Sequence, residues 1–209
     1  MKLEKIFDQE KIRLAVEAAE KKTSGEIVPL VIHASSTYAW VHMFCAAIFL
    51  VFFSLAFVVY EKHSPWPPRW QAIFEWQVFG AFLGLLLSYV PFLKRHMIPK
   101  NRRDFEVHKR ALAEFMEQGL TRTSDRTGVL IYVSLFERQV NILADSGIND
   151  KVGPGFWQSQ VDTLCLGMAE QRPSEALTKV IAEIGAKLAQ NFPPKADDKN
   201  ELMNELRIK

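Results

Sequence analysis

A long run without a single Asp, Glu, Lys or Arg is the feature that most constrains this chain. The run extends from Ala39 to Tyr60, and only His42 and Ser54 within it are plainly polar. A helix needs about 20 apolar residues to cross the hydrocarbon core of a bilayer. Because a helix of a soluble domain normally keeps one polar face, this run predicts a transmembrane helix.

A second apolar run, from Ala72 to Leu93, is less uniform, since Glu75 lies in its first turns. A charge near a helix end can reach the interface, whereas a charge at the bilayer centre is costly. We therefore predict a second span, antiparallel to the first because only Glu61–Gln71 separate them. Gly80 and Gly84 are spaced for close helix packing, although chance spacing is an equal alternative.

The orientation of this predicted hairpin follows from its flanking residues. The connecting loop holds only two Lys or Arg residues, whereas five follow the second span. By the positive-inside rule, both soluble parts and both termini are expected in the cytoplasm, at the cell inner membrane. The residues expected at the membrane interface are Trp66, Trp70, Trp76, Lys94 and Arg95.

Composition excludes some alternatives. The formal net charge is +2, so the overall charge gives no indication of a nucleic-acid partner. The five basic residues that follow the second span lie against its end. Membrane orientation and contact with phospholipids therefore explain them better than a nucleic-acid partner does. Cys45 and Cys165 form neither a metal-spaced pair nor a disulfide framework, which indicates a reducing compartment. The charged start of the chain predicts no signal peptide.

The residues before the first span predict one helix and one strand. Helical spacing of apolar residues covers Lys2–Lys22, and Glu26–Ala34 is dense in β-branched residues typical of a buried strand. Pro29 within that strand favours an edge position or a bulge. This strand has no partner ahead of the membrane segment.

The residues after the second span predict a longer series. One helix covers Arg103–Gln118, with a one-sided face made of Phe105, His108, Leu112, Phe115 and Met116. A β-hairpin and two further helices follow it. The ranges are 128–136 and 139–144 for the two strands, about 150–170 for the first helix, and a last helix capped by Ser174 that ends at Asn191.

The order of these elements predicts an α/β fold, a small mixed sheet sandwiched by helices and interrupted by a two-helix transmembrane hairpin. The first strand is expected to join the sheet formed by the later hairpin. The predicted segments are 1–37 and 95–194 for the two parts of the domain, 38–94 for the hairpin, and 195–209 for a flexible tail.

Several motifs outside the spans resemble the TPM domain family, and they cover nearly all of the soluble sequence. One is G-V-L-I-Y-V-S-x-x-E-R-Q-V-N-I-L-A-D-S-G-I over Gly128–Ile148, in which the stretch around Glu137–Ile148 is the most specific part. Others are T-S-G-E-I-V-P-L-V over Thr23–Val31, Trp157 in the following helix, and Phe192-Pro193 at the close of the last helix. Many relatives carry a signal peptide and a C-terminal span. Spans inside the domain are similar to an inner-membrane branch.

The resemblance implies a sheet sandwiched by helices, which agrees with the patterns above. It implies no single activity, because members are described as phosphatases, as calcium-binding proteins, or as accessory proteins of membrane complexes. The difference in the position of the spans weakens the transfer of any of these roles.

The carboxylates expected at strand ends are the candidate metal ligands, because oxygen ligands suit Ca²⁺ and Mg²⁺. They are Asp145, Asp125, Glu26 and Asp150, with Glu137 at the hairpin turn as a further candidate. Asp145 is the strongest, since a nearby glycine lets backbone approach, although Asp often accepts backbone hydrogen bonds in such turns. No catalytic residue is indicated, and the cofactor remains open between none, Ca²⁺ and Mg²⁺.

Two functions agree with these observations. In the first, the chain is a membrane-anchored TPM-domain protein, a cytoplasmic-face binding or accessory module whose partners are the lipid bilayer and other membrane proteins. In the second, it is a divalent-metal-dependent phosphatase. The scarcity of recognisable catalytic motifs favours the first.

Overall fold

The computed structural model describes residues 6–67, 69–123, 125–194, 202 and 204–209. The chain divides into two compact units. The sheet unit combines Met1–Ser35 with Asp104–Lys209, and the hairpin unit comprises Ser36–Arg103. The sheet unit is therefore assembled from two separate pieces of chain.

A four-stranded mixed sheet forms the centre of the sheet unit, with the strand order β3-β2-β1-β4. β1 is parallel to both of its neighbours, and β2 and β3 form an antiparallel hairpin. This confirms the expectation that the first strand joins the later hairpin. The strands are β1 (Glu26–Ile32), β2 (Gly128–Ser134), β3 (Gln139–Ala144) and β4 (Arg207–Ile208).

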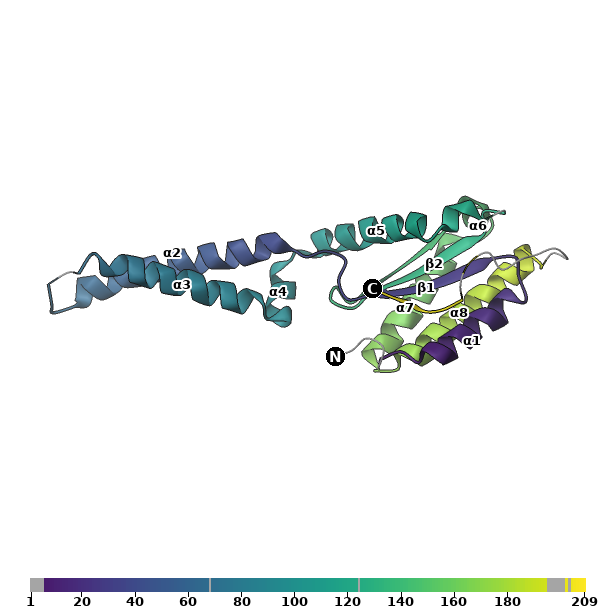
Figure 1. Cartoon of the computed structure of the whole chain (residues 1–209), viewed down its shortest axis with the longest axis horizontal. Coiled ribbons are helices and arrows are strands. Elements are labelled where there is room, and N and C mark those ends of the chain that lie inside the picture. The colour runs from purple at the N-terminus through teal and green to yellow at the C-terminus, as the bar shows by residue number, and fades with distance from the viewer. Residues whose placement is uncertain (1–5, 68, 124, 195–201, 203) are drawn as a thin grey trace. The chain divides into compact units, whose positions relative to one another are not determined.

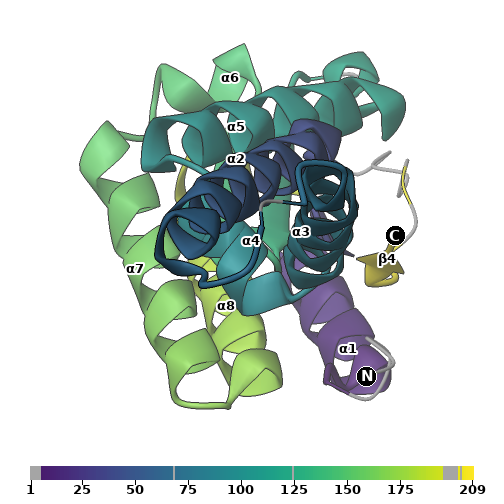
Figure 2. The ribbon, with the colours of Figure 1, turned by 90° about the vertical axis from the view of Figure 1, so that its left-hand side faces the viewer.

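Helices cover both faces of this sheet (Figures 1 and 2). Alternate residues of β1 and β2 point to opposite faces, so each strand contributes to two apolar cores. One core contains α1 (Gln9–Glu20), α7 (Pro154–Ala169) and α8 (Pro173–Asn191). The other contains α5 (Lys100–Glu117) and the 3-10 turn η2 (Leu120–Arg122). Burial on both faces explains why these strands are continuously apolar.

The outer edge of β1 explains the position of Pro29. β4 pairs only with Leu30 and Val31, so the edge is open at Pro29, which has no N–H to leave unpaired. Two residues earlier along this edge, the Ile27 N–H donates to Glu20 Oε1 at 2.9 Å. β1 lies between β2 and β4 in the strand order, so the expected edge position describes only the part of β1 before Leu30.

The two helices after the sheet begin differently from the expectation. A separate short helix, α6 (Ser146–Asn149), precedes α7, which begins at Pro154 because proline fits the first turn of a helix. Arg172 is the N-cap of α8. The prediction that Ser174 caps this helix is wrong, because its hydroxyl instead accepts a hydrogen bond from Asp8 N at 2.8 Å.

The buried face of α5 also differs from the expectation. Val107, Ala111, Glu114 and Phe115 are buried against the sheet. Phe105, Leu112 and Met116 are exposed. The apolar residues that are most prominent in the sequence of α5 therefore form a second, outward-facing stripe.

The end of the chain contributes to the sheet. A flexible tail was predicted over 195–209, yet Arg207–Ile208 form β4, Leu206 is buried and Lys209 hydrogen-bonds to the end of β1. Residues 195–201 and 203 of this predicted tail, like residues 1–5 of the predicted first helix, lie outside the described residues.

The hairpin unit contains α2 (Ala39–His63), α3 (Ala72–Ser88) and α4 (Pro91–Met97), with α2 and α3 packed side by side (Figure 1). A continuous helix was predicted from Ala72 to Leu93, but α3 and α4 form an angle of 97°. Pro91 explains the break, because it lacks an N–H and disfavours helical backbone at the preceding Val90.

Gly80 and Gly84 lie in the contact between α2 and α3. A Cβ atom on Gly84 would lie 2.6 Å from the Cys45 carbonyl oxygen, and one on Gly80 would lie 2.8 Å from that of Phe49. The spacing of the two glycines therefore reflects close backbone packing.

Among the described residues, one helix, α2, is long and apolar enough to cross a membrane, and 11% of its most apolar window is buried. α3 and α4 pass the same test only when taken together as a bent pair. A core helix of a soluble domain would be mostly buried, so the exposed apolar surface of α2 differs from that class.

Replacing Gly84 by alanine is expected to destabilise the hairpin unit by about 1–3 kcal/mol, because the new methyl group meets backbone that cannot rotate away. Thermal unfolding of the full chain in detergent, followed by circular dichroism, measures this. The matched control is Ala47→Val on the exposed surface of α2. An unchanged midpoint for Gly84→Ala would contradict the close packing.

Candidate functional site

The candidate carboxylates at strand ends lie toward one edge of the sheet. Glu26 pairs with Gly128 at the start of β1 and β2, and the Asp145 N–H donates to the Gly128 carbonyl at 2.9 Å. The loop that contains Asp125 approaches the same edge, because a Cβ on Gly147 would lie 3.1 Å from the Asp125 carbonyl oxygen. Asp150 is exposed at the end of α6.

Asp145 has the most distinctive environment of the four. Its Oδ1 atom caps α6 by accepting from Ser146 N at 2.6 Å and from Ser146 Oγ at 3.2 Å. The residue is only 8% exposed, and its Oδ2 atom has no hydrogen-bond partner among the described residues. One oxygen is thus used structurally, and the other remains available.

A complete metal site is not assembled by these residues. Within the described ranges, no group of three or more His, Cys, Asp or Glu side chains is placed to hold a metal ion. The edge therefore offers the unused oxygen of Asp145 and nearby carbonyl groups, and a cation there would need backbone or water ligands as well.

A carboxylate pair lies at the start of β1. Burial raises the pKa of Glu20 to about 8, the Ile27 N–H opposes this shift, and the charge of neighbouring Glu26 adds to it. The side chain of Asn204 also hydrogen-bonds to Glu20 and lowers its pKa. Glu20 is consequently a protonated, neutral acid near pH 7.

A second polar cluster lies at the opposite end of β1, around the buried Glu137. Its carboxylate accepts from Ser35 N at 3.0 and 3.3 Å and from the Ser134 hydroxyl. The Ser35 hydroxyl is in turn 3.2 Å from Ser134 Oγ and 3.0 Å from the Tyr132 hydroxyl. Burial raises the pKa of Tyr132 to about 12, so this phenol stays protonated. The cluster fixes the point at which the chain leaves β1.

The predicted interfacial aromatic residues lie around the loop end of the hairpin unit. Trp66 and Trp70 are exposed, whereas Trp76 packs between the rings of Phe57 and Tyr60, at centroid distances of 5.9 and 5.8 Å. Amphipathic rings of this kind are enriched at membrane interfaces, and the interfacial role of these three residues stays a prediction.

Lys94 lies at the other end of this unit. Its Nζ donates to the Thr37 carbonyl at 2.7 Å and lies 3.3 Å from His42 Nε2. With Nε2 accepting, the His42 Nδ1–H donates to Ser88 Oγ at 2.6 Å, and Ser88 donates to the Leu85 carbonyl at 2.6 Å. This chain of bonds joins the starts of α2 and α4 to the end of α3. Arg95, the other predicted interfacial cation, lies beside it in α4.

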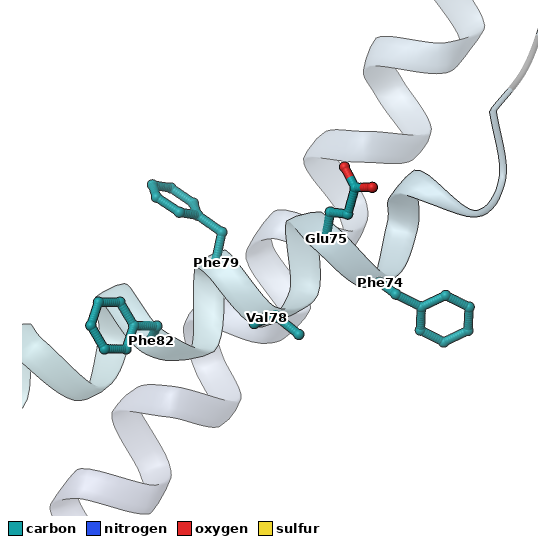
Figure 3. A pocket seen from close by; sticks show the side chains of 5 residues that line it. All are labelled: Phe74, Glu75, Val78, Phe79 and Phe82. Carbon is teal, nitrogen blue, oxygen red and sulfur yellow. The ribbon is translucent and has the colours of Figure 1, made fainter.

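A shallow hollow on the outer surface of α3 is lined by Phe74, Glu75, Val78, Phe79 and Phe82 (Figure 3). Glu75 is the one charged residue in this set. Its place in the first turn of α3 suits a carboxylate, because the N-terminal end of a helix carries partial positive charge.

Comparisons with known proteins bear on the later part of this chain and on its fold. Its sheet unit is a three-layer α/β sandwich, and residues 96–187 match the sequence model of the TPM domain family. Among solved structures, the chain is similar to the NMR structure of BA42 protein from the psychrophilic bacterium Bizionia argentinensis. That match has a TM-score of 0.61 at 23% identity, and covers 100% of this chain and 99% of the other. No curated protein gives a significant match.

Sequence reasoning missed the most deeply buried charged residue, Glu114 of α5, and its partner Lys209. The sequence does contain one indication that Glu114 is buried. Glu114 lies seven residues after Val107 and three after Ala111, which places all three residues on one helical face. Lys209 carries no such signal, because only the tertiary fold places it beside α5.

The raised pKa of Glu20 predicts a pH-dependent stability. Between about pH 4.5 and pH 8 the folded chain holds a proton that the unfolded chain releases, so the free energy of unfolding falls as pH rises through this range. Glu20→Gln should remove this slope and raise stability at pH 9 by about 2 kcal/mol. Urea unfolding at pH 5, 7 and 9 tests it, with exposed Glu175→Gln as control. A slope equal to that of the wild type would contradict the assignment.

Replacing Glu137 by alanine should destabilise the sheet unit by about 2–4 kcal/mol, because the half-buried Ser35 N–H and the buried Ser134 hydroxyl lose their acceptor. Arg138→Gly in the same turn is the control, since Arg138 has a φ of 54° that glycine adopts without strain. Equal unfolding midpoints in urea for the two variants would contradict the role of Glu137.

Proposed function

We propose that this chain is a membrane-anchored protein that holds a TPM-type domain at the cytoplasmic face of the inner membrane, where the domain binds other membrane proteins. The observation that carries this proposal is the exposed apolar surface of α2, which continues for 25 residues with little burial. Removal of that surface from water needs lipid or another apolar partner.

The composition of the hairpin unit supports a lipid environment on both helices. α2 and α3 pack through glycine, and most of the large apolar side chains point away from that contact. Examples are Phe52, Leu55, Val78, Phe82 and Leu86. Small residues inside and large ones outside are typical of helices packed in membranes. In this proposal α2 and the bent pair α3–α4 are the two passes.

The two ends of the hairpin unit support the proposed orientation. The loop end is rich in Trp and Tyr, whereas the other end continues into five basic residues over 94–103. The positive-inside rule then assigns both termini and the sheet unit to the cytoplasm.

A binding role is supported by the outward stripe of α5. Phe105, Leu112 and Met116 recur on one helical face and are exposed, while the opposite face of α5 is buried against the sheet. Apolar helix surface of this kind is typical of a contact with another protein or with lipid.

Labelling with a membrane-impermeant maleimide tests the topology, because Cys165 is exposed and Cys45 is buried. In the wild type, Cys165 should react in inside-out vesicles and not in intact cells. Ser64→Cys combined with Cys165→Ser should show the reverse pattern. Reaction of Cys165 in intact cells would contradict the orientation, and recovery of the protein in the soluble fraction would contradict the anchor.

A second candidate function, a divalent-metal-dependent phosphatase, is favoured by one observation, the unpaired and buried Oδ2 atom of Asp145. A hard cation such as Ca²⁺ or Mg²⁺ would take this oxygen together with the backbone oxygens of the Asp125 loop. Glu26 and Asp150 remain proposed contributors to such a site.

If Asp145 binds a cation, Ca²⁺ or Mg²⁺ should shift the amide NMR signals of residues 125–128 and 145–150, and Asp145→Asn should weaken the apparent affinity at least about tenfold. Asp162→Asn on the exposed side of α7 is the control. Phosphoester turnover that depends on the same cation and on Asp145 would favour the phosphatase. The absence of both responses would exclude this candidate.

A further inference from the structure

Residues 207–209 lie along the outer edge of β1, and Leu206 precedes them. β4 is only two residues long and parallel to β1, with Leu30 paired to Arg207 and Val31 to Ile208. Beyond β4, Lys209 N donates to the Val31 carbonyl and His33 N donates to the Lys209 carbonyl, both at 3.1 Å. This is the geometry by which a peptide adds to a sheet edge.

Two side chains of this segment make specific contacts. Leu206 is buried in the core shared by α1, α7 and α8. Three residues later, Lys209 Nζ donates to Glu114 Oε2 at 2.6 Å and to Glu117 Oε2 at 3.3 Å. The edge therefore recognises an extended backbone, an apolar side chain and an ammonium group at fixed spacing.

Glu114 makes the ammonium contact selective. Its side chain is fully buried in α5, and it accepts from Arg110, Gln118 and Lys209 at 2.6, 2.9 and 2.6 Å. Burial acts to raise the pKa of Glu114, but the hydrogen bonds from Lys209 and Gln118 outweigh it, so the pKa lies below its usual range. A buried carboxylate of this kind strongly favours a cation and disfavours a neutral replacement.

The contact made by the in-chain segment is small enough to be exchanged. Its backbone pairing with β1 covers only residues 207–209, and the Lys209 side chain is 43% exposed, where solvent screening weakens an ion pair. Strand addition takes its affinity mainly from the main chain, so a competing extended segment can make the same hydrogen bonds.

We propose that Val31, His33, Glu114 and Glu117 form an edge site for an extended, lysine-bearing segment of a membrane-protein partner, and that residues 204–209 occupy this site until such a segment displaces them. The expected ligand has an apolar side chain three residues before its lysine, as Leu206 precedes Lys209. This inference deepens the proposed function, on which it rests for the identity of the partner.

Charge and reach favour a partner in the same membrane. Val31 precedes the first residue of α2, Ala39, by eight residues, so a short segment of chain links the edge site to the proposed membrane anchor. Cytoplasmic segments next to transmembrane helices are enriched in Lys and Arg, which complements the two glutamates. Residence in one bilayer also raises the local concentration of such a segment.

A fluorescent peptide with the sequence of residues 204–209 (Asn-Glu-Leu-Arg-Ile-Lys) tests the site on the full chain in detergent. Lys209→Ala should bind it at least about tenfold more tightly than the wild type, because the in-chain competitor is weakened. Adding Glu114→Gln to Lys209→Ala should reverse this gain, and a peptide ending in Ala should bind the Lys209→Ala chain at least about tenfold more weakly than the peptide ending in Lys. Lys179→Ala, in an exposed ion pair on α8, should behave as the wild type does.

Two outcomes would overturn the proposal. Equal affinity of the Lys209→Ala chain for the Lys-ending and Ala-ending peptides would show that the site does not select lysine, whether or not the Glu114 variant folds. Light scattering that reveals wild-type dimers, lost in Lys209→Ala, would assign the site to a second copy of this chain. Peptide binding in detergent does not depend on membrane orientation. A failure of the topology proposed above, shown by the maleimide experiment, is therefore distinguishable from a failure of the edge site, shown by the peptide experiment.

Discussion

The parallel pairing of β1 with β2 is the interaction on which the rest of the structure depends. The two strands belong to pieces of chain on either side of the hairpin unit, and Ser35 and Glu137, which hydrogen-bond at the end of this pairing, are 102 residues apart. Both cores of the sheet unit use side chains from these two strands, so neither core is complete without the pairing.

Parallel strands need a crossover connection, and here α5 supplies it while the hairpin unit adds length ahead of it. The entropic cost of closing a loop grows only slowly with its length, so a compact insertion is tolerated when its ends are held. Glu137 holds one end by binding Ser35, and the other end continues directly into α5. A carboxylate that the sequence offers as a candidate ligand at the hairpin turn thus has a structural role.

Local patterns predicted most of the elements, and tertiary contacts decided the remainder. Continuous β-branched runs predicted β1 and β2, because both faces of each strand are buried. Pro91 divides the second apolar run into two helices at an angle, and a count of apolar residues does not predict such a bend. Glu114 and Lys209 escaped prediction, since their pairing depends on where the last residues of the chain meet α5. Asp145 and Asp125 were expected together, and the structure brings their loops to one edge without completing a metal site.

The central claim is that two separated pieces of chain form one cooperative sheet. Hydrogen exchange of the full chain in lipid nanodiscs, read by mass spectrometry, tests it most directly. Peptides covering β1 and β2 should exchange equally slowly and lose protection together as urea is added, because one unfolding event exposes both. Rapid exchange across 26–32 while 128–134 remains protected would contradict the pairing and the domain that depends on it.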